Sequence, residues 1–386
     1  MGNIFDYLQW RGDVPLGTDP FNEVDNLILA ELVYADFEGS VSSSFERTGL
    51  KTVRERYFAT HSREKAEKSS HHIQRAPLLM DGMISGCRFG GMELAGFMDV
   101  LNDDKDMQIA AVTCILDDGS IYVSFRGTDN TVTGWKEDFN MSYMSDSEGQ
   151  LSAVRYLNEA GAAFSGPIRV GGHSKGGNFA VYASAFCEKE IQDRIINVYT
   201  NDGMGFRSEV MAREGYERIL PKVVSIVPDT SVIGMLLMSS AEHVVVKSSS
   251  KGFAQHDSMT WQVERNRFAA SETTALGTFI ENSQKDWLNK IDDESRETFV
   301  NTLFSIFEST GASTFGEMKE NRRKSAERMI SSLKGLPKEK QDEIKAIIGG
   351  LIQSGTQAAK DRIRKGSGDR GRMPGGQIWT KTTKKK

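Results

Sequence analysis

The sequence predicts an α/β fold, built around a mostly parallel central sheet with helices on both faces. Two Val- and Ile-rich segments, 108–116 and 120–125, are joined by Asp117-Asp118-Gly119, which is typical of a hairpin turn. From about residue 148 to 247, strand-like and helix-like segments alternate, as they do in parallel βαβ units. After about residue 268 the strand pattern stops and only helical patterns follow.

Each element is predicted from its own pattern. The first 75 residues are helical and polar, with an apolar helix face over 24–33. The hairpin follows, and then the alternation gives helix 149–164, strand 167–171, helix 176–188 and strand 194–199. The same alternation continues through the segments 207–218, 223–227, 231–240 and 243–247.

The C-terminal third is predicted to be helical and then disordered. Phe299, Leu303, Ile306 and Phe307 share one helix face, and a second apolar face covers 344–352 after Pro337. From Lys360 onward, ten Lys or Arg residues stand against two Asp, a composition typical of disorder. We expect one domain over 1–268, a helical region over 269–359 and a basic tail over 360–386. The tail is either a solubilising segment or a contact for an anionic surface.

Composition excludes several classes of protein. The formal net charge of −5 argues against nucleic acid as a partner, because phosphate binding needs a positive excess. The three widely spaced cysteines predict neither disulfides nor a zinc site, and the adjacent His71 and His72 are expected to be solvated loop residues.

The longest apolar run, 232–238, is too short to cross a bilayer. No signal peptide is visible, so we expect a soluble, cytoplasmic protein without a cofactor.

The segment Gly172-His173-Ser174-Lys175-Gly176 has the G-x-S-x-G pattern of a nucleophile elbow. In such an elbow a sharp turn from strand to helix exposes a serine hydroxyl at the edge of the sheet. The context fits, because 168–170 is strand-like and 178–186 is helix-like. A phosphate-binding loop would need a lysine after the last glycine, whereas Lys175 precedes Gly176. Ser174 is therefore the candidate nucleophile, and a glycine-rich turn with an incidental serine is the alternative.

This elbow, together with the upstream run Val123-Ser124-Phe125-Arg126-Gly127-Thr128, resembles the lipase-like (class 3, fungal-lipase type) branch of the α/β-hydrolases. Residues 1–265 are similar to an uncharacterised bacterial group of that branch. The resemblance implies an α/β-hydrolase fold and hydrolysis of carboxylic esters, with lipids or other small acyl esters as substrates. A thioesterase or peptidase would use the same residues, and an inactive hydrolase-fold binding module is a further alternative.

Two residues are expected to stabilise the oxyanion. The amide that follows the nucleophile, that of Lys175, is the first donor. The resemblance implies that the loop after Phe125 supplies the second, through the amide or hydroxyl of Thr128. The alternative for this loop is a Gly-Thr turn with Arg126 in a structural ion pair.

The triad of this fold runs Ser, then Asp or Glu, then His. Asp202 and Asp229 both end predicted strands after Ser174. Since the acid usually comes one strand beyond the neighbour of the elbow strand, we favour Asp229 and keep Asp202 as the alternative acid. His256, in a polar loop after the last strand, is preferred as the base over His243, which starts a strand.

Lys175 departs from the many lipases that carry an apolar residue after the serine. We expect its side chain to point to solvent. The alternative is that it favours a substrate with a phosphate or carboxylate.

Overall fold

The computed structural model describes residues 2–129, 131–235, 237–278, 282, 292–311, 321–336 and 338. The predicted basic tail over 360–386 and the predicted helix over 344–352 lie outside the described residues.

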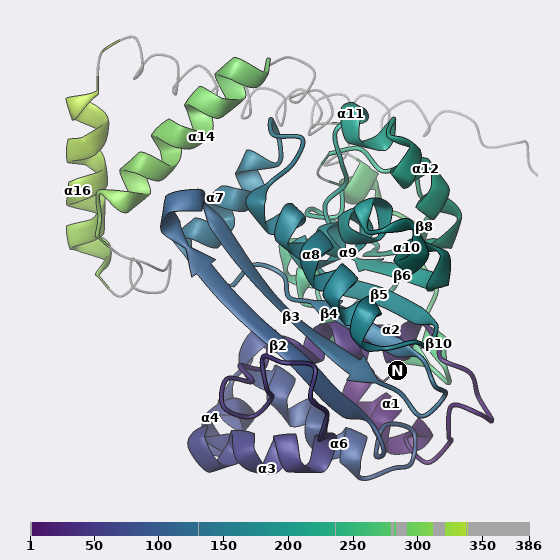
Figure 1. Ribbon diagram of the computed structural model, residues 1–386. Helices are drawn as coiled ribbons and strands as arrows, with labels where there is room; N and C mark the ends of the chain where they lie inside the picture. The colour runs from purple at the N-terminus through teal and green to yellow at the C-terminus, as the bar shows by residue number, and fades with distance from the viewer. Residues whose placement is uncertain are drawn as a thin grey trace, which may run out of the picture.

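A single eight-stranded sheet forms the centre of the molecule (Figure 1), and its strands lie side by side in the order of the sequence. Strands β1 to β4 pair antiparallel and β4 to β8 pair parallel. The strands are β1 (Thr48–Gly49), β2 (Glu93–Asn102), β3 (Met107–Ile115), β4 (Ile121–Phe125), β5 (Ile168–His173), β6 (Ile195–Asn201), β7 (Val223–Pro228) and β8 (His243–Val246). The predicted hairpin is confirmed as β3 and β4, and Gly119 in its turn has a φ of +80°.

Strand order decides which helices cover which face. Parallel strands connected by right-handed crossovers, always in the same direction along the sheet, place every connecting helix on one face. That face carries α8 (Glu148–Ala163), α9 (Lys175–Phe186), α10 (Lys189–Arg194), α11 (Ser208–Met211) and α12 (Glu214–Ile219). A first hydrophobic core lies between these helices and the sheet.

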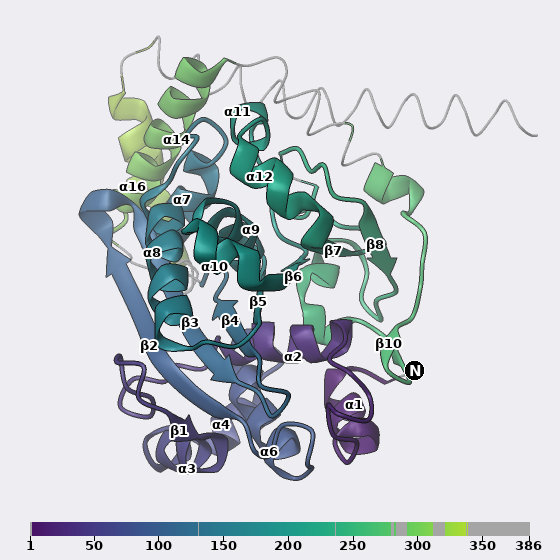
Figure 2. The same cartoon turned by 45° about the vertical axis from the view of Figure 1, so that its right-hand side comes forward.

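The N-terminal helices cover the opposite face, as Figure 2 shows for α1 and α2. They are α1 (Ile4–Arg11), α2 (Glu23–Leu32), α3 (Leu50–Thr60), α4 (Arg63–Lys68), α5 (His72–Arg75) and α6 (Leu79–Ile84), with the short 3₁₀ turn η1 (Ala76–Leu78). A second hydrophobic core fills the space beneath them. The predicted α/β fold, mostly parallel and covered by helices on both faces, is confirmed.

Helix α2 shows how the sequence specifies this second layer. Asn22 caps its first turn and Asp25 closes a capping box. The apolar face predicted over 24–33 is buried against β4, β5 and β6. Asp25 itself is buried and forms a two-pronged ion pair with Arg88, so the charged residue on the inner side of the helix has a partner.

The remaining described elements are short turns and strands and three further helices. They are η2 (Asp103–Lys105), α7 (Val132–Asn140), η3 (Leu220–Lys222), η4 (Gly252–His256), η5 (Ser258–Thr260), β9 (Val263–Glu264), β10 (Arg267–Phe268), α14 (Asp293–Glu308) and α16 (Arg322–Gly335). The segment 231–240 was expected to continue the alternation as a helix. Its described residues are irregular instead, because Gly234 N–H bonds to a loop carboxylate and Met238 pairs with Phe206.

The C-terminal helical region packs on α7 (Figure 1). Val300 and Phe304 of α14 form a small buried cluster with Val132 of α7, and the rings of Phe139 and Phe304 are 5.7 Å apart. Among the described residues, no helix is long and apolar enough to span a bilayer.

Candidate active site

Ser174 lies at a sharp turn between β5 and α9. Its backbone has φ +56° and ψ −131°, a conformation that costs energy for a residue with a side chain and is typical of strained functional positions. The flanking glycines explain why the turn can form. A Cβ on Gly172 would lie 2.3 Å from the Gly176 carbonyl carbon, and one on Gly176 would lie 2.1 Å from the Phe125 oxygen. The G-x-S-x-G pattern is therefore a steric requirement of this elbow.

Ser174, His256 and Asp202 form a continuous hydrogen-bonded chain. His256 Nε2 lies 3.0 Å from Ser174 Oγ, and His256 Nδ1 lies 2.7 Å from Asp202 Oδ2. The three residues come from three different places: the elbow after β5, the end of η4, and the residue that follows β6. Ser174 and Asp202 are buried, and the His256 side chain is 20% exposed. This is the geometry in which an imidazole can take a proton from a serine while a carboxylate fixes its tautomer.

The preference for Asp229 as the partner of His256 is wrong in the structure. Strand β6 is the direct neighbour of β5, and Asp202 follows β6 with a φ of +49°, which turns the chain toward the elbow. The Asp229 carboxylate instead accepts hydrogen bonds from Gln255 Nε2 at 2.8 Å and from Ser271 Oγ at 3.3 Å. Asp229 thus holds the residue that precedes His256, rather than His256 itself.

The groups around Asp202 stabilise its ionised form. Burial alone would raise its pKa, but the hydrogen bond and the charge of His256, together with the Ser231 hydroxyl, lower the pKa below its usual value. The Gly234 N–H adds a further hydrogen bond at 3.1 Å. The segment 231–240, which was predicted to be a helix, thus supplies hydrogen-bond donors to the Asp202 carboxylate.

The loop that carries His256 is held on both sides. Gln255 donates to Asp229 and accepts from the Thr230 N–H at 2.8 Å, while the indole of Trp261 donates to the Gln255 carbonyl at 2.9 Å. Trp261 is fully buried beneath the loop. His243, the rejected base, lies in β8 as expected and bonds to Ser225 at 2.8 Å.

The Gly127–Thr128 loop lies directly against the elbow. A Cβ on Gly127 would come within 3.0 Å of the Ser174 Cβ and within 2.5 Å of the His173 oxygen. The Thr128 hydroxyl donates to Asp138 Oδ2 at 2.6 Å, so this hydroxyl is already engaged. The amides of Thr128 and Lys175 donate to no residue in the described part of the chain. Arg126 forms the structural ion pair with Asp99, at 2.6 Å and 2.9 Å.

Lys175 points inward, which overturns both expectations for its side chain. It is fully buried, and its ammonium group lies 2.9 Å from Glu137 Oε2 on α7. Glu137 also accepts hydrogen bonds from Ser147, Gly149 and Gln108 N–H, so both of its oxygens are satisfied. The ammonium group is consequently neither solvated nor available to a substrate.

Asp138 is a further carboxylate near the hydrogen-bonded chain of Ser174, His256 and Asp202. Its Oδ1 is buried, accepts no hydrogen bond from the described residues, and lies 3.9 Å from the Lys175 ammonium. Burial raises the pKa of Asp138 to about 6, although Lys175, Thr128 and His256 act in the opposite direction. Glu137 and Asp138 were not among the residues predicted from sequence. The only available signal was an acidic pair on a helix directly after the Thr128 loop.

Glu31, His72 and His173 are of the right types to bind a metal ion, since one ligand atom of each lies within 4.8 Å of the others. Each of these atoms already has a partner. His72 Nδ1 lies 3.0 Å from Glu31 Oε2, and His173 Nδ1 lies 3.0 Å from the Tyr34 hydroxyl. The structure therefore favours a hydrogen-bonded network here. His72 is mostly buried in it, contrary to the expectation of a solvated loop residue.

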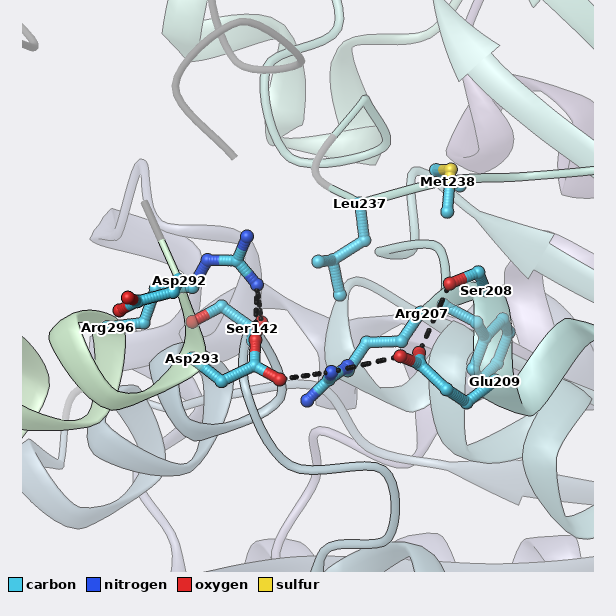
Figure 3. Close-up of a pocket in the computed structure, with 10 residues that line it drawn as sticks. Ser142, Arg207, Ser208, Glu209, Leu237, Met238, Asp292, Asp293 and Arg296 are labelled. Atoms are coloured by element: carbon cyan, nitrogen blue, oxygen red, sulfur yellow. Dashed lines mark hydrogen bonds and ion pairs between the residues drawn. The ribbon is translucent and has the colours of Figure 1, made fainter. Parts of the chain in front are cut away.

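A cavity of about 460 Å³ lies where α14 meets the segments around Ser142, Arg207 and Met238 (Figure 3). Leu237 and Met238 form one wall, and Arg207 reaches across to Asp293 of α14, 2.5 Å away. Arg296 of α14 donates to the Ser142 carbonyl at 3.0 Å. The lining residues include no member of the Ser174 chain, and the two arginines are already paired with protein groups.

The chain was compared with curated proteins, solved structures and protein-family models. No curated protein matches the chain. Among solved structures, the chain is similar to the crystal structure of M37 lipase, with 13% identity and a TM-score of 0.36 over 56% of this chain and 70% of that chain. A protein-family model described as Mbeg1-like matches residues 83–305, which is more than half of the chain and includes the elbow, Asp202 and His256. The protein therefore belongs to the Mbeg1-like family.

Proposed function

We propose that the protein is a serine hydrolase that cleaves carboxylic esters by way of an acyl-enzyme. The observation that carries this proposal is the hydrogen-bonded chain from Ser174 through His256 to Asp202, with the serine at a strained elbow. A serine hydroxyl becomes a nucleophile only when a base is within hydrogen-bonding reach and its own position is fixed. Both conditions are met here.

In the proposed reaction, His256 Nε2 takes the proton of Ser174 as Oγ attacks the acyl carbonyl carbon. The carbonyl oxygen becomes an oxyanion, which the amides of Lys175 and Thr128 stabilise. His256 then gives its proton to the departing alcohol. In the second half, water gives a proton to His256 and attacks the acyl carbon. The bond from that carbon to Ser174 Oγ breaks, His256 returns the proton to Oγ, and the acid is released. Asp202 keeps the imidazole in the required tautomer and stabilises its charge throughout.

The substrate class follows from the resemblance and from Lys175. Because the Lys175 ammonium is bound by Glu137, the residue after the nucleophile gives no reason to prefer an anionic substrate. We therefore propose neutral acyl esters, including lipid esters, as the substrates. Thioesters and peptides are tested as alternatives in the same assay, as is a binding module without turnover.

A fluorophosphonate probe tests the proposal, because it labels only an activated serine. We expect labelling at Ser174, identified by mass spectrometry, and none in Ser174→Ala. On acyl esters of increasing chain length, Ser174→Ala should lower kcat by about 10⁴-fold or more, since triad members act as a unit. If the unaltered protein is not labelled, the proposal is wrong and the alternative, a binding module without turnover, is favoured. Faster turnover of thioesters or peptides than of esters would replace the substrate class.

A further inference from the structure

A buried polar network lies next to the elbow. It joins Glu31 and Tyr34 from the α2 region, His72 from α5, His173 from β5, and Ser258 from the loop that carries His256. Glu31, His173 and Ser258 are fully buried. Ionisable groups at such depth are costly unless paired, so the network calls for a physical explanation.

His173 is fixed in one tautomer. Burial lowers its pKa to about 3, so the ring is neutral at physiological pH and carries a single proton. Its Nε2 lies 2.8 Å from the His256 carbonyl oxygen, which can only accept. The proton is therefore on Nε2, and Nδ1 accepts from the Tyr34 hydroxyl. His173 thus holds the backbone of the residue that serves as base.

Glu31 holds the same loop two residues further on. Its Oε1 accepts a hydrogen bond from the Ser258 hydroxyl at 2.5 Å, and its Oε2 accepts from His72 Nδ1 at 3.0 Å. Burial alone would raise the pKa of Glu31, but the charge and the hydrogen bond of His72, with the Ser258 hydrogen bond, lower it, while Glu31 raises the pKa of His72 against the effect of burial. Through the hydrogen bonds of its two oxygens, Glu31 links His72 to Ser258 and so anchors the loop.

We propose that Glu31 and His72 are positioning residues for the catalytic base: they act through Ser258 and the His256 backbone to keep the imidazole within reach of Ser174. This proposal rests on the proposed function. Both residues precede residue 83, where the match to the Mbeg1-like family begins. The N-terminal segment is therefore part of the active site and more than a covering layer for the sheet.

The test compares Glu31→Gln, His72→Gln and Ser258→Ala with a matched control, Asp25→Asn. Asp25 lies on the same helix and forms an equally buried ion pair, with Arg88, which does not touch the His256 loop. Ser258→Ala removes one hydrogen bond on the loop side, so it remains informative if Glu31→Gln fails to fold. The readouts are kcat and KM on an acyl ester, the rate of fluorophosphonate labelling, and amide hydrogen exchange over 252–260.

We expect the three test variants to lower kcat and the labelling rate by about ten- to a hundredfold with KM nearly unchanged, because a hydrogen bond to a charged group is lost. Exchange over 252–260 should become faster. Asp25→Asn should lower the melting temperature while leaving kcat and the exchange over 252–260 unaltered.

Three results would overturn the proposal: test variants with unchanged labelling and exchange, a control that loses activity to the same extent, or a Zn²⁺-dependent rise in melting temperature that His72→Gln abolishes. The last result would assign the network to a metal. If the unaltered protein is not labelled at all, the proposed function fails, and hydrogen exchange still decides whether Glu31 and His72 hold the loop.

Discussion

Asp202 and Asp229 differ in what their carboxylates can reach, although both follow strands of the same parallel sheet. Asp202 needs a left-handed backbone conformation to face His256, and it is supported by Ser231 and Gly234. Asp229 follows the next strand, β7, and its carboxylate accepts a hydrogen bond from Gln255. The difference arises from loop geometry, which no pattern in the sequence displays.

We predict that Asp202→Asn lowers kcat on an acyl ester by about 10⁴-fold, because an amide in that position stabilises the wrong imidazole tautomer. Asp229→Asn should lower kcat by less than about tenfold, since it weakens one hydrogen bond in the support of the loop. The two variants are assayed side by side at neutral pH. The reverse order of effects would restore Asp229 as the acid.

Asp138 gives a prediction about pH. A raised pKa in the folded state means that the folded protein keeps this proton longer than the unfolded chain does. Stability is therefore lost as pH rises from about 4, the unfolded pKa, through about 6. Relative to Asp138→Asn, the unaltered protein should lose about 2 kcal/mol of unfolding free energy between pH 4.5 and pH 8.

Chemical denaturation of both proteins at the two pH values measures this difference. An equal pH dependence in the two proteins would show that Asp138 is not titrating in this range. Since the Asn oxygen can still accept from Thr128, the comparison isolates the charge.

The residues that could be predicted from sequence are those whose local pattern has a steric cause. Gly172 and Gly176 are required by the elbow, so Ser174 could be found from five letters, and His256 could be found because few histidines follow the acid. Glu137 and Glu31 could not be found in this way. The residues next to them in the sequence give no sign of their contacts with Lys175 and Ser258, which are distant in the sequence.

At the scale of elements, α7 connects the two residues proposed to bind the oxyanion. Its Glu137 holds the side chain of Lys175, and the adjacent Asp138 holds the hydroxyl of Thr128. Two successive residues of one helix thus fix both sides of the proposed oxyanion hole. The amides themselves are left without a protein partner in the described residues, as donors to a transient charge must be.

Glu137→Gln should destabilise the protein by about 3–5 kcal/mol, because it leaves the buried Lys175 ammonium without its counter-charge. The double variant Glu137→Gln/Lys175→Met should recover most of that loss, since it removes both charges. Urea denaturation of the single and double variants gives the coupling energy between the two residues. Additive losses would mean that the pair contributes nothing as a pair.

The strands and the crossover helices were predictable because their periodicity reflects burial on one or two faces. The segment 231–240 was not, since its apolar residues suit a helix while its Gly234 N–H is needed by Asp202. The contact between Gly234 and Asp202 therefore determines the local structure of this segment. The N-terminal helices could be predicted as helices, but not as the cover of the second face of the sheet.

At the scale of the whole molecule, the C-terminal helix α14 supports the site indirectly. It covers the outer side of α7 through Val300 and Phe304, and Lys136 of α7 lies 3.5 Å from Glu308. The family match extends to residue 305 and so includes most of this helix.

We predict that Phe304→Ala weakens the docking of α14 by about 3 kcal/mol, because it removes the largest side chain from a small buried cluster. Limited proteolysis should then cut the helix before the rest of the protein unfolds, and kcat should fall severalfold as α7 loses its support. Glu294→Ala, on the exposed side of the same helix, is the control. An unchanged kcat in a variant whose α14 is cut would show that α7 needs no such support.

The N-terminus lies beside β9 and β10 (Figure 2). Gly2 pairs with Val263, the indole of Trp10 donates to the Arg265 carbonyl, and Glu23 accepts from the Phe268 amide. During synthesis on the ribosome, the first helices therefore emerge more than two hundred residues before the chain that completes their packing. The loop that carries His256, with its contacts to Glu31 and His173, also leaves the ribosome late. A nascent chain should consequently acquire a reactive serine only after residue 268 has left the ribosome, in a single late step of folding.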